Sequence, residues 1–508
     1  MAGVRPDSSP VDDESALSRR SASIYEALGV RPIINCGSVR TIYGNSLMLD
    51  RVRLAMEHAA KEFVLLEELA EAIGARLARL TGAEWGMVTA GSAAGLALAA
   101  AACVAGNDPE RMLRLPFSDA TNVVLAPVGH RFAYDQAIRA IGCPINEFGS
   151  VADLEEFLRA RPVALISVLG DRDDPSSPVS LERIAAVARR FNVPILVDAA
   201  SDFPSVPIPW LTRGADLVVF SVGKFMRGPA AAGLLLGRER LVRAAWLNGS
   251  PHQAFGRMLK TSKEQMVGAL VALEEWLDRD VLADERDWST RIDQIADRIR
   301  PLPGASLELV RQTGRVPKLR ITWDATLHPM TSEDLRTRLL SGSPRILIDD
   351  IGATSNSVLI DPFNIRDEEA AIVGEALERA LAPFAGTPMQ AIEPEIDLAG
   401  RWAIRIDFAN GERRHEFHIV QQRHQLSGEH LRSWGSGELR GAIEGAQASL
   451  ESTHTYEGNV VRFSFRTERA QRDMMEGVVV MGVSAPHTLG PVALGQFGKA
   501  KWHGERVG

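Results

Sequence analysis

The chain has 508 residues, of which 45% are hydrophobic and 24% are charged, the composition of a soluble globular enzyme rather than of a disordered chain. This length exceeds what one hydrophobic core organises, so two or three domains are expected. A net charge of −8 argues against a broad nucleic-acid-binding surface. The cysteines show neither CxxC pairing nor metal-ligand spacing, which fits a reducing cytoplasm and no structural zinc (Cys36, Cys103 and Cys143).

The N-terminal part of the chain combines a polar start with helical periodicity. Residues 1–20 lack the apolar core of a secretory signal, and their composition predicts disorder. Apolar residues recur at helical spacing over 49–80, which predicts one or two amphipathic helices. The most apolar run, residues 93–105, is too short to span a bilayer and predicts a buried helix, so no membrane partner is expected.

A turn of small residues precedes that buried helix. A short strand ends at Thr89 and is followed by Gly91, Ser92 and Ala93. Small residues allow a phosphate to approach the free N–H groups at a helix start, where the helix dipole favours an anion. The turn lacks the spacing of a Walker loop or a dinucleotide fingerprint, and an ordinary helix N-cap at Ser92 is the alternative.

Apolar strands then alternate with helices, which predicts an α/β fold with a mostly parallel sheet covered on both faces. The strands are expected at residues 122–127, 163–169, 193–198, 217–221 and 232–236. Ligands of such sheets bind at the carboxyl ends of the strands. Side chains suited to chemistry gather at or just beyond these ends (Thr89, His130, Asp198 and Lys224).

Lys224 lies in a Ser- and Gly-rich turn, Ser221–Pro229, between two apolar strands. Burial lowers the pKa of an amine, as a Schiff-base lysine requires, although many lysines at strand ends simply reach water. Asp198 ends another apolar strand, where it is either the N-cap of a following helix or a buried anion that meets a cation. An anion beside a pyridinium nitrogen and an amine beside an aldehyde are what pyridoxal phosphate demands of a protein.

The second half of the chain predicts two smaller units. A charged helix, strands near 319–323 and 346–348, and a closing helix over 368–381 indicate a small α+β domain. Beyond a linker the periodicity is near two, which predicts short antiparallel strands in a barrel or sandwich, and the histidines there lack zinc-ligand spacing. The expected boundaries are a disordered start (1–20), a large domain with its N-terminal segment (21–285), the small domain (286–385), the linker (386–394) and a C-terminal β-barrel-like domain (395–508).

Several segments occur in the order found in one family of enzymes: Arg31–Asn35, Thr81–Glu84, Thr89–Leu96, Val193–Ala200, Ser221–Pro229 and Gly256–Met258. With these segments, residues 25 to about 385 resemble the pyridoxal-phosphate enzymes of fold type I, the aspartate-aminotransferase fold. Within that fold they are similar to the group of selenocysteine synthase (L-seryl-tRNA selenium transferase) and D-glucosaminate-6-phosphate ammonia-lyase. The C-terminal domain resembles a β-barrel appended to some members of this group.

The resemblance implies a set of site residues. Lys224 would form the internal aldimine with the cofactor, and Asp198 would pair with the pyridinium nitrogen. His130 would stack on the ring, and four small residues would hold the phosphate (Gly91, Ser92, Ala93 and Ser221). A guanidinium grips a carboxylate bidentately, so the candidates for binding the substrate are arginines and one tyrosine from the same loop as the first of them (Arg40, Tyr43, Arg257, Arg320 and Arg345).

Departures from the family pattern lie beside the lysine. Val222 replaces a glycine of the family's Ser-Gly-Gly-Lys, and Ala230 replaces a glutamine. Ser201–Pro204 differs from the apolar stretch expected after Asp198. These differences concern the surroundings of the active site, so the resemblance implies the cofactor but not the substrate of the relatives.

The expected function is a lyase of the ammonia-lyase or dehydratase type. Lys224 would take the Cα proton of a small polar amino acid or amino-sugar acid, and β-elimination would lead to a 2-oxo acid and ammonia. A racemase, an aldolase or an aminotransferase stays open, because the same carbanion partitions in several ways.

A non-catalytic protein that binds the cofactor is the alternative of another class, although a degenerate site has no need to keep both Lys224 and Asp198. Fold type I also implies a homodimer or a larger homo-oligomer. The acidic chain argues against a tRNA substrate.

Overall fold

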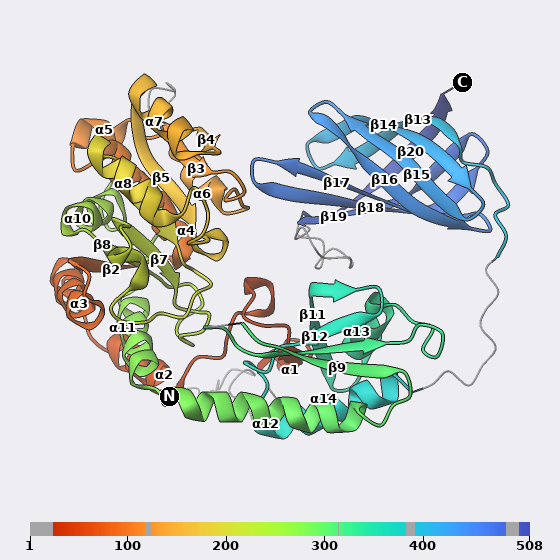
Figure 1. Cartoon of the computed structure of the whole chain (residues 1–508), viewed down its shortest axis with the longest axis horizontal. Helices are drawn as coiled ribbons and strands as arrows, with labels where there is room; N and C mark the ends of the chain where they lie inside the picture. The colour runs from red at the N-terminus through yellow and green to blue at the C-terminus, as the bar shows by residue number, and fades with distance from the viewer. Residues whose placement is uncertain (1–23, 117–122, 313, 383–391, 484–496, 508) are drawn as a thin grey trace, which may run out of the picture.

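A computed structural model describes residues 24–116, 123–312, 314–382, 392–483 and 497–507 (Figure 1). The strands form three assemblies: a seven-stranded sheet, a five-stranded sheet and a closed eight-stranded barrel. The segment predicted to be disordered, 1–20, and most of the predicted linker 386–394 lie outside the described residues. The domain boundaries remain predictions.

The seven-stranded sheet has the order β2-β8-β7-β6-β5-β3-β4. Only β8 runs antiparallel to its neighbours, β2 and β7, and the other adjacent pairs are parallel. The predicted α/β fold with a mostly parallel sheet is therefore confirmed. Its strands are β2 (Trp85–Thr89), β3 (Val123–Pro127), β4 (Ile145–Phe148), β5 (Val163–Leu169), β6 (Ile195–Asp198), β7 (Leu217–Ser221) and β8 (Gly233–Gly237).

Helices cover both faces of this sheet because successive side chains of each strand point to opposite sides. Val123 and Leu125 of β3 belong to one hydrophobic cluster, whereas Val124 and Ala126 belong to another. The second cluster contains most of α4 (Gly91–Ala105), whose alanines pack closely on the strands. The remaining helices of this part are α2 (Asp50–Ala60), α3 (Leu66–Thr81), α5 (Pro109–Leu113), α6 (Asp135–Arg139), α7 (Val151–Ala160), α8 (Leu181–Phe191), α9 (Pro209–Thr212), α10 (Glu239–Asn248) and α11 (Lys263–Asp278).

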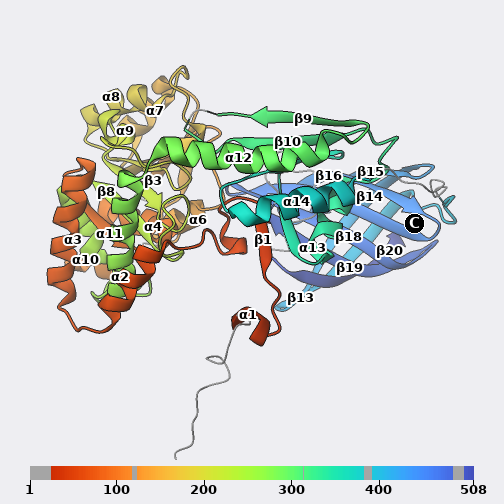
Figure 2. The same ribbon diagram turned by 90° about the horizontal axis from the view of Figure 1, so that it is seen from below.

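The five-stranded sheet has the order β1-β11-β12-β10-β9 and carries its own hydrophobic cluster. Helices α12 and α14 lie together against it (Figure 2). Strand β1 comes from the N-terminal segment and pairs in parallel with β11, a long-range pairing that the sequence did not indicate. The elements are α1 (Ile24–Ala27), β1 (Ile33–Cys36), α12 (Val281–Ile299), β9 (Ala305–Val310), β10 (Lys318–Trp323), α13 (Ser332–Ser341), β11 (Arg345–Thr354), β12 (Ser357–Ile360) and α14 (Asp367–Ala380).

The C-terminal barrel closes through β13 and β20, and all its neighbouring strands are antiparallel. Alternating apolar residues predict four of these strands, at 403–408, 415–420, 460–465 and 477–482, and these segments lie within β13, β14, β18 and β19. The other four strands are rich in Gly, Ser and charged residues, so their sequences do not show a clear alternation of apolar residues. They pair with their neighbours through backbone hydrogen bonds in the closed barrel. The strands are β13 (Gly400–Phe408), β14 (Gly411–Gln422), β15 (Gln425–Arg432), β16 (Gly435–Glu444), β17 (Gln447–Tyr456), β18 (Asn459–Gln471), β19 (Met474–Val483) and β20 (Lys499–Val507).

None of the helices in the described ranges combines the length and the apolar character needed to cross a membrane.

The packing of α4 gives a test of this fold. Leu98 is 2% exposed in α4 and packs beside Gly249 and Gly256, so Leu98→Ala leaves a cavity there and is expected to lower the free energy of unfolding by about 3 kcal/mol. Leu113→Ala is the matched control, since Leu113 is 74% exposed, and a change within about 0.5 kcal/mol is expected. Urea unfolding of both variants measures the difference. Equal effects of the two substitutions would contradict the assigned packing.

Candidate active site

The predicted cofactor residues lie along one edge of the seven-stranded sheet. Strands β2, β7, β6, β5 and β3 all end at this edge, since β2 and β7 are both antiparallel to β8 and β7, β6, β5 and β3 are parallel. Across the sheet, Thr89 pairs with Gly233 and Gly233 with Ser221, while Asp198 pairs with Leu169. The order of strands thus places the turn before α4, the Ser221–Pro229 turn and Asp198 along a single line.

Lys224 lies in a turn that the backbone holds firmly. The Val222 N–H donates to Ala232 O at 3.0 Å, and the Lys224 carbonyl accepts a hydrogen bond of 2.7 Å from Ser46 Oγ. The lysine Nζ donates to Ser201 Oγ at 2.8 Å. Burial lowers the pKa of the Lys224 amine, an effect that the nearby carboxylate of Asp198 opposes. The half-buried lysine is therefore held at the carboxyl edge of the sheet, where burial lowers the pKa of its amine.

Asp198 is a buried carboxylate, 5% exposed. Its Oδ1 accepts a hydrogen bond of 2.9 Å from the Ala200 N–H. Burial raises its pKa to about 6, against the opposing influence of that hydrogen bond and of Lys224. It is not a helix N-cap, because residues 199–208, all of them described, contain no helix. A buried acid of this kind fits a cationic ring nitrogen.

The turn before α4 fits a phosphate. The N-cap of α4 is Ala90, which offers no side chain to the first N–H groups, so the alternative of an N-cap at Ser92 is wrong. Gly91 has a φ of +81°, which favours glycine, and the turn presses on Gly233. A Cβ at Gly233 would lie 2.6 Å from Gly91 C and from Ser92 N. The first N–H groups of α4 thus have no side-chain cap. They lie close to β8 because Gly233 has no side chain.

His130 follows β3 at the same edge of the sheet and is linked to the strand next to that of Asp198. It is 8% exposed, and its Nδ1 accepts a hydrogen bond of 3.2 Å from the N–H of Leu169, the residue that pairs with Asp198. This bond places the ring proton on Nε2. Burial lowers the pKa of His130 and so favours the neutral ring. A flat, neutral ring is therefore held one strand away from the buried carboxylate.

Arg315 and its partners were not singled out from the sequence. Arg315 comes from the loop between β9 and β10, and it donates to Ser201 O, to Asp171 and, at 2.9 Å, to Asp202 Oδ1. Asp202 Oδ2 also accepts a hydrogen bond of 2.9 Å from Trp210. Through Ser201, the five-stranded sheet reaches the amine of Lys224. Ser201 and Asp202 belong to the Ser201–Pro204 segment, whose departure from the family pattern could have indicated a role at the site. Arg315, a single arginine in a loop, has no such pattern in the sequence.

One of the departures from the family pattern is a core residue. Val222 is 0% exposed and belongs to the hydrophobic cluster on one face of the sheet. A Cβ at Gly228 would lie 2.4 Å from its Cγ1, so the valine and the glycine fit one another. Ala230, by contrast, is exposed. Of the two substitutions, the one at Val222 therefore concerns packing.

The candidate substrate residues lie in different places. Arg40 and Tyr43 share a loop, with the guanidinium 5.3 Å from the ring centre, and this loop contacts the lysine turn because the Ser46 N–H donates to Gly223 O at 3.1 Å. Arg257 is exposed and 3.5 Å from Ser250 Oγ.

The other two candidates, Arg320 and Arg345, contact residues of the five-stranded sheet and the segments next to it. Arg320 donates to Gly352 O at 3.0 Å and pairs with Glu308 at 3.2 Å. Arg345 donates to Leu340 O at 2.9 Å and to Arg31 O at 3.4 Å. Of the five candidates, Arg40 and Tyr43 are thus the pair whose loop touches the lysine turn.

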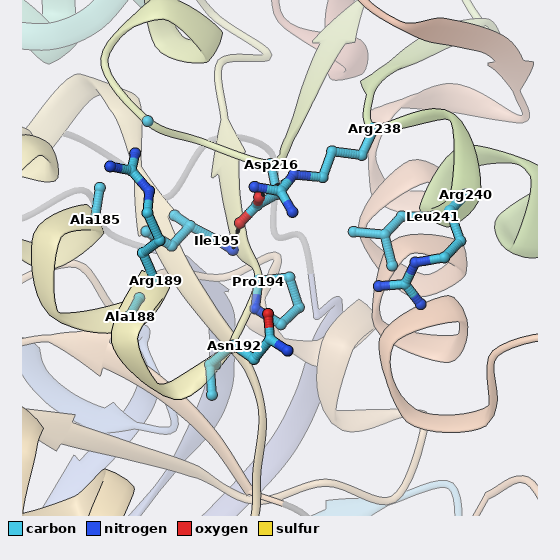
Figure 3. A pocket seen from close by; sticks show the side chains of 12 residues that line it. Ala185, Ala188, Arg189, Asn192, Pro194, Ile195, Asp216, Arg238, Arg240 and Leu241 are labelled. Carbon is cyan, nitrogen blue, oxygen red and sulfur yellow. Dashed lines mark hydrogen bonds and ion pairs between the residues drawn. The ribbon is translucent and has the colours of Figure 1, made fainter.

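Two hollows of the protein differ in their distance from the candidate site. The pocket in Figure 3, about 90 Å³, is at the opposite edge of the sheet, where Ile195 begins β6 and Asp216 pairs with Arg238 at 2.6 Å. A cavity of about 670 Å³ adjoins the lysine turn and is lined by Arg227, by residues 47–51 and by residues 363–368. Arg227 donates from Nε to Leu47 O at 3.1 Å. The pocket in Figure 3 is therefore remote from the candidate site.

Comparisons with known proteins agree with this geometry. The Aminotransferase class-V family model matches residues 178–269, which include Asp198 and Lys224. A 5'-C-glycyluridine monooxygenase-decarboxylase of Streptomyces sp. is 30% identical over 72% of this chain and 93% of its own length. The D-glucosaminate-6-phosphate ammonia lyase of Salmonella typhimurium is 28% identical over 69% of this chain and 96% of its own.

A solved structure of D-glucosaminate-6-phosphate ammonia-lyase superposes with a TM-score of 0.64 and 26% identity, covering 71% of this chain and 99% of that one. L-seryl-tRNA(Sec) selenium transferases also match, at lower identity. These matches cover nearly the whole length of the lyase but only about seven tenths of this chain. The chain belongs to the fold type I family of pyridoxal-phosphate-dependent enzymes that includes these lyases, and its cofactor is pyridoxal 5'-phosphate (PLP).

Proposed function

We propose that the enzyme is a lyase that releases ammonia from a small polar amino acid or an amino-sugar acid and leaves a 2-oxo acid. The observation that carries the proposal is a half-buried lysine and a buried carboxylate at one sheet edge, Lys224 and Asp198, in a chain similar to an ammonia lyase over nearly that enzyme's whole length. PLP, when bound, supplies an electron sink for the pair of electrons left when a bond to the substrate's Cα breaks.

We assign each side chain a role consistent with its surroundings. Asp198 would hold the ring nitrogen, and His130 would lie against the ring. The N–H groups at the start of α4, with Ser221, would bind the phosphate. Lys224 would carry the cofactor and then move the proton at the substrate's Cα, and burial lowers the pKa of its amine. Ser201 Oγ, 2.8 Å from Nζ, would orient that amine.

The proposed reaction balances without an outside oxidant. Loss of the Cα proton and of a hydroxide from Cβ gives an enamine and water, and hydrolysis of the corresponding imine takes one water up again. The net change converts a 2-amino-3-hydroxy acid into a 3-deoxy-2-oxo acid and ammonia. Arg40, in the loop that touches the lysine turn, is the candidate for the substrate carboxylate.

A second candidate is an oxygen-consuming decarboxylation. It is favoured by the 30% identity to the monooxygenase-decarboxylase over 93% of that enzyme's length. The two reactions can be told apart because the oxygen-consuming decarboxylation takes up oxygen and releases carbon dioxide, whereas the lyase reaction does neither.

We further propose a homo-oligomer in a reducing cytoplasm. The oligomer is supported by an exposed apolar stretch between α2 and α3, Phe63–Leu65, in which Phe63 is fully exposed. The reducing compartment is supported by the three cysteines, all of them free thiols.

A substrate panel with Lys224→Ala as its control tests the reaction. Wild-type enzyme with PLP is expected to release ammonia and a 2-oxo acid from at least one 2-amino-3-hydroxy acid, while Lys224→Ala loses the visible cofactor band and at least about a thousandfold in kcat. Ammonia assay, oxygen electrode and absorbance spectra measure this. Oxygen uptake with carbon dioxide release would instead favour the second candidate, and turnover by Lys224→Ala at the wild-type rate would contradict both.

The pKa of Asp198 gives a test by pH. Because the folded pKa, about 6, lies above the ordinary 3.8, the folded protein binds more protons than the unfolded chain between these values, so this carboxyl costs stability as pH rises through that window. Cofactor-free Asp198→Asn is therefore expected to be more stable than the wild type at pH 7.5, by on the order of 1–3 kcal/mol, with the difference vanishing near pH 4.

Thermal or urea unfolding across this pH range measures the stability difference. The same variant, loaded with PLP, is expected to lose about a hundredfold in kcat, since the ring nitrogen lacks its anion. A cofactor-free variant that is less stable than the wild type at pH 7.5 would refute the assignment of Asp198 as a strained functional acid.

The phosphate turn is tested at Gly233. The methyl group of Gly233→Ala would lie 2.6 Å from the backbone of Gly91 and Ser92, so the turn must move. The dissociation constant of PLP is expected to rise at least about tenfold, whereas that of pyridoxal, which lacks the phosphate, stays within about twofold. Absorbance titration gives both constants. Equal weakening of the two ligands would place the phosphate elsewhere.

A further inference from the structure

A hairpin tip of the barrel touches the large α/β part of the chain. The turn between β17 and β18, residues 456–459, lies beside α6 and the loop after β3 (Figure 1). That loop contains His130, which the proposed site places against the cofactor ring. The contact therefore joins the C-terminal barrel to a cofactor-binding segment more than 300 residues earlier in the sequence.

An ion pair forms the centre of this contact. Arg131 Nη2 lies 2.5 Å from Glu457 Oε2, and the Arg131 side chain is only 13% exposed. The same guanidinium binds Asp135 through Nε at 2.5 Å and donates to Ile145 O at 3.3 Å. Asp135, which is 3% exposed in its side chain, also accepts from the Phe132 N–H at 3.3 Å. Glu457 thus completes the set of partners of an arginine adjacent to His130.

Close packing accompanies the ion pair. A Cβ at Gly458 would lie 2.6 Å from Phe132 N and 2.7 Å from Phe132 O, so the hairpin backbone rests directly on the backbone of the loop. Beside it, the guanidinium of Arg139 lies 5.9 Å from the ring centre of Tyr456 and its Nε 3.6 Å from Glu457. The contact combines shape and charge, which distinguishes it from an exposed surface salt bridge.

We infer that the β17–β18 hairpin holds the His130 loop in place for the cofactor, with Glu457 and Arg131 as positioning residues. The His130 ring accepts a hydrogen bond from the Leu169 N–H, its backbone N–H donates to Pro127 O at 3.0 Å, and the next residue is anchored to the barrel. Loss of the anchor would free the loop and widen the range of ring positions, without removing any group that touches the cofactor. The inference rests on the proposed placement of PLP between His130 and Asp198.

Glu457→Gln in the full chain tests this inference, because it keeps the shape of the side chain and removes its charge. Two quantities are measured: amide hydrogen exchange over residues 128–136 without cofactor, and the dissociation constant of PLP from the visible band. We expect faster exchange in that segment and a dissociation constant raised about fivefold. Gly458→Ala, which pushes the hairpin off the Phe132 backbone, is expected to act in the same direction.

Glu438→Gln is the matched control. Glu438 pairs with Arg440 on β16 at 2.6 Å, and both side chains are well exposed on the barrel. Both readouts are expected to equal those of the wild type for this variant. If Glu457→Gln and Gly458→Ala leave exchange over 128–136 unchanged, the inference is overturned. Faster exchange with an unchanged PLP dissociation constant also overturns it, because the loop would then be held without consequence for the cofactor.

The two proposals fail in different ways. A wild-type protein that binds PLP but shows no turnover would remove the proposed lyase reaction and leave the positioning role intact. The substitution Glu457→Asp shortens the side chain but retains its charge, and it is expected to recover most of the PLP affinity that Glu457→Gln loses. A Glu457→Asp variant as weak as Glu457→Gln would show that the charge has no part in the contact and would overturn the role given to the ion pair.

Discussion

Burial shifts the pKa values of two side chains at one edge of the sheet in opposite directions. The interior lowers the pKa of Lys224 and raises that of Asp198 to about 6, so the fold disfavours the charged form of both groups. Such groups persist only where the surrounding structure over-determines their position. Here that structure is the parallel sheet, whose strand order sets the line from the α4 turn to Asp198, and the tight backbone turn around Lys224.

The other two parts of the chain also act on this edge. The five-stranded sheet reaches the lysine through Arg315, which grips Ser201 and Asp202, and Ser201 accepts a hydrogen bond from the lysine amine. The barrel reaches the loop of His130 through Glu457. Both contacts are made by an arginine bound to carboxylates or to backbone oxygens, which fixes direction as well as distance. Long-range polar contacts thus connect the candidate active site with both smaller units.

Sequence patterns predicted the local elements well and the long-range contacts poorly. Apolar strands and their carboxyl ends were readable because burial on both faces demands continuous apolar runs, and the family segments led to the cofactor, which the comparisons confirm. The pairing of β1 with β11, the reach of Arg315 and the partner of Arg131 could not be predicted, since a single charged residue in a loop has no periodicity. Four barrel strands were missed for the related reason that polar, Gly-containing segments pair through their backbones.

The central claim is that Lys224 carries the cofactor, and the most direct measurement is the site of covalent attachment. Borohydride reduction of the PLP-loaded enzyme, followed by proteolysis and mass spectrometry, fixes the pyridoxal group on the lysine that holds it. The account predicts the modification on the peptide that contains Lys224 and on no other. Modification of a different lysine, such as Lys260 or Lys263, or an unmodified Lys224 peptide in fully loaded enzyme, would contradict it.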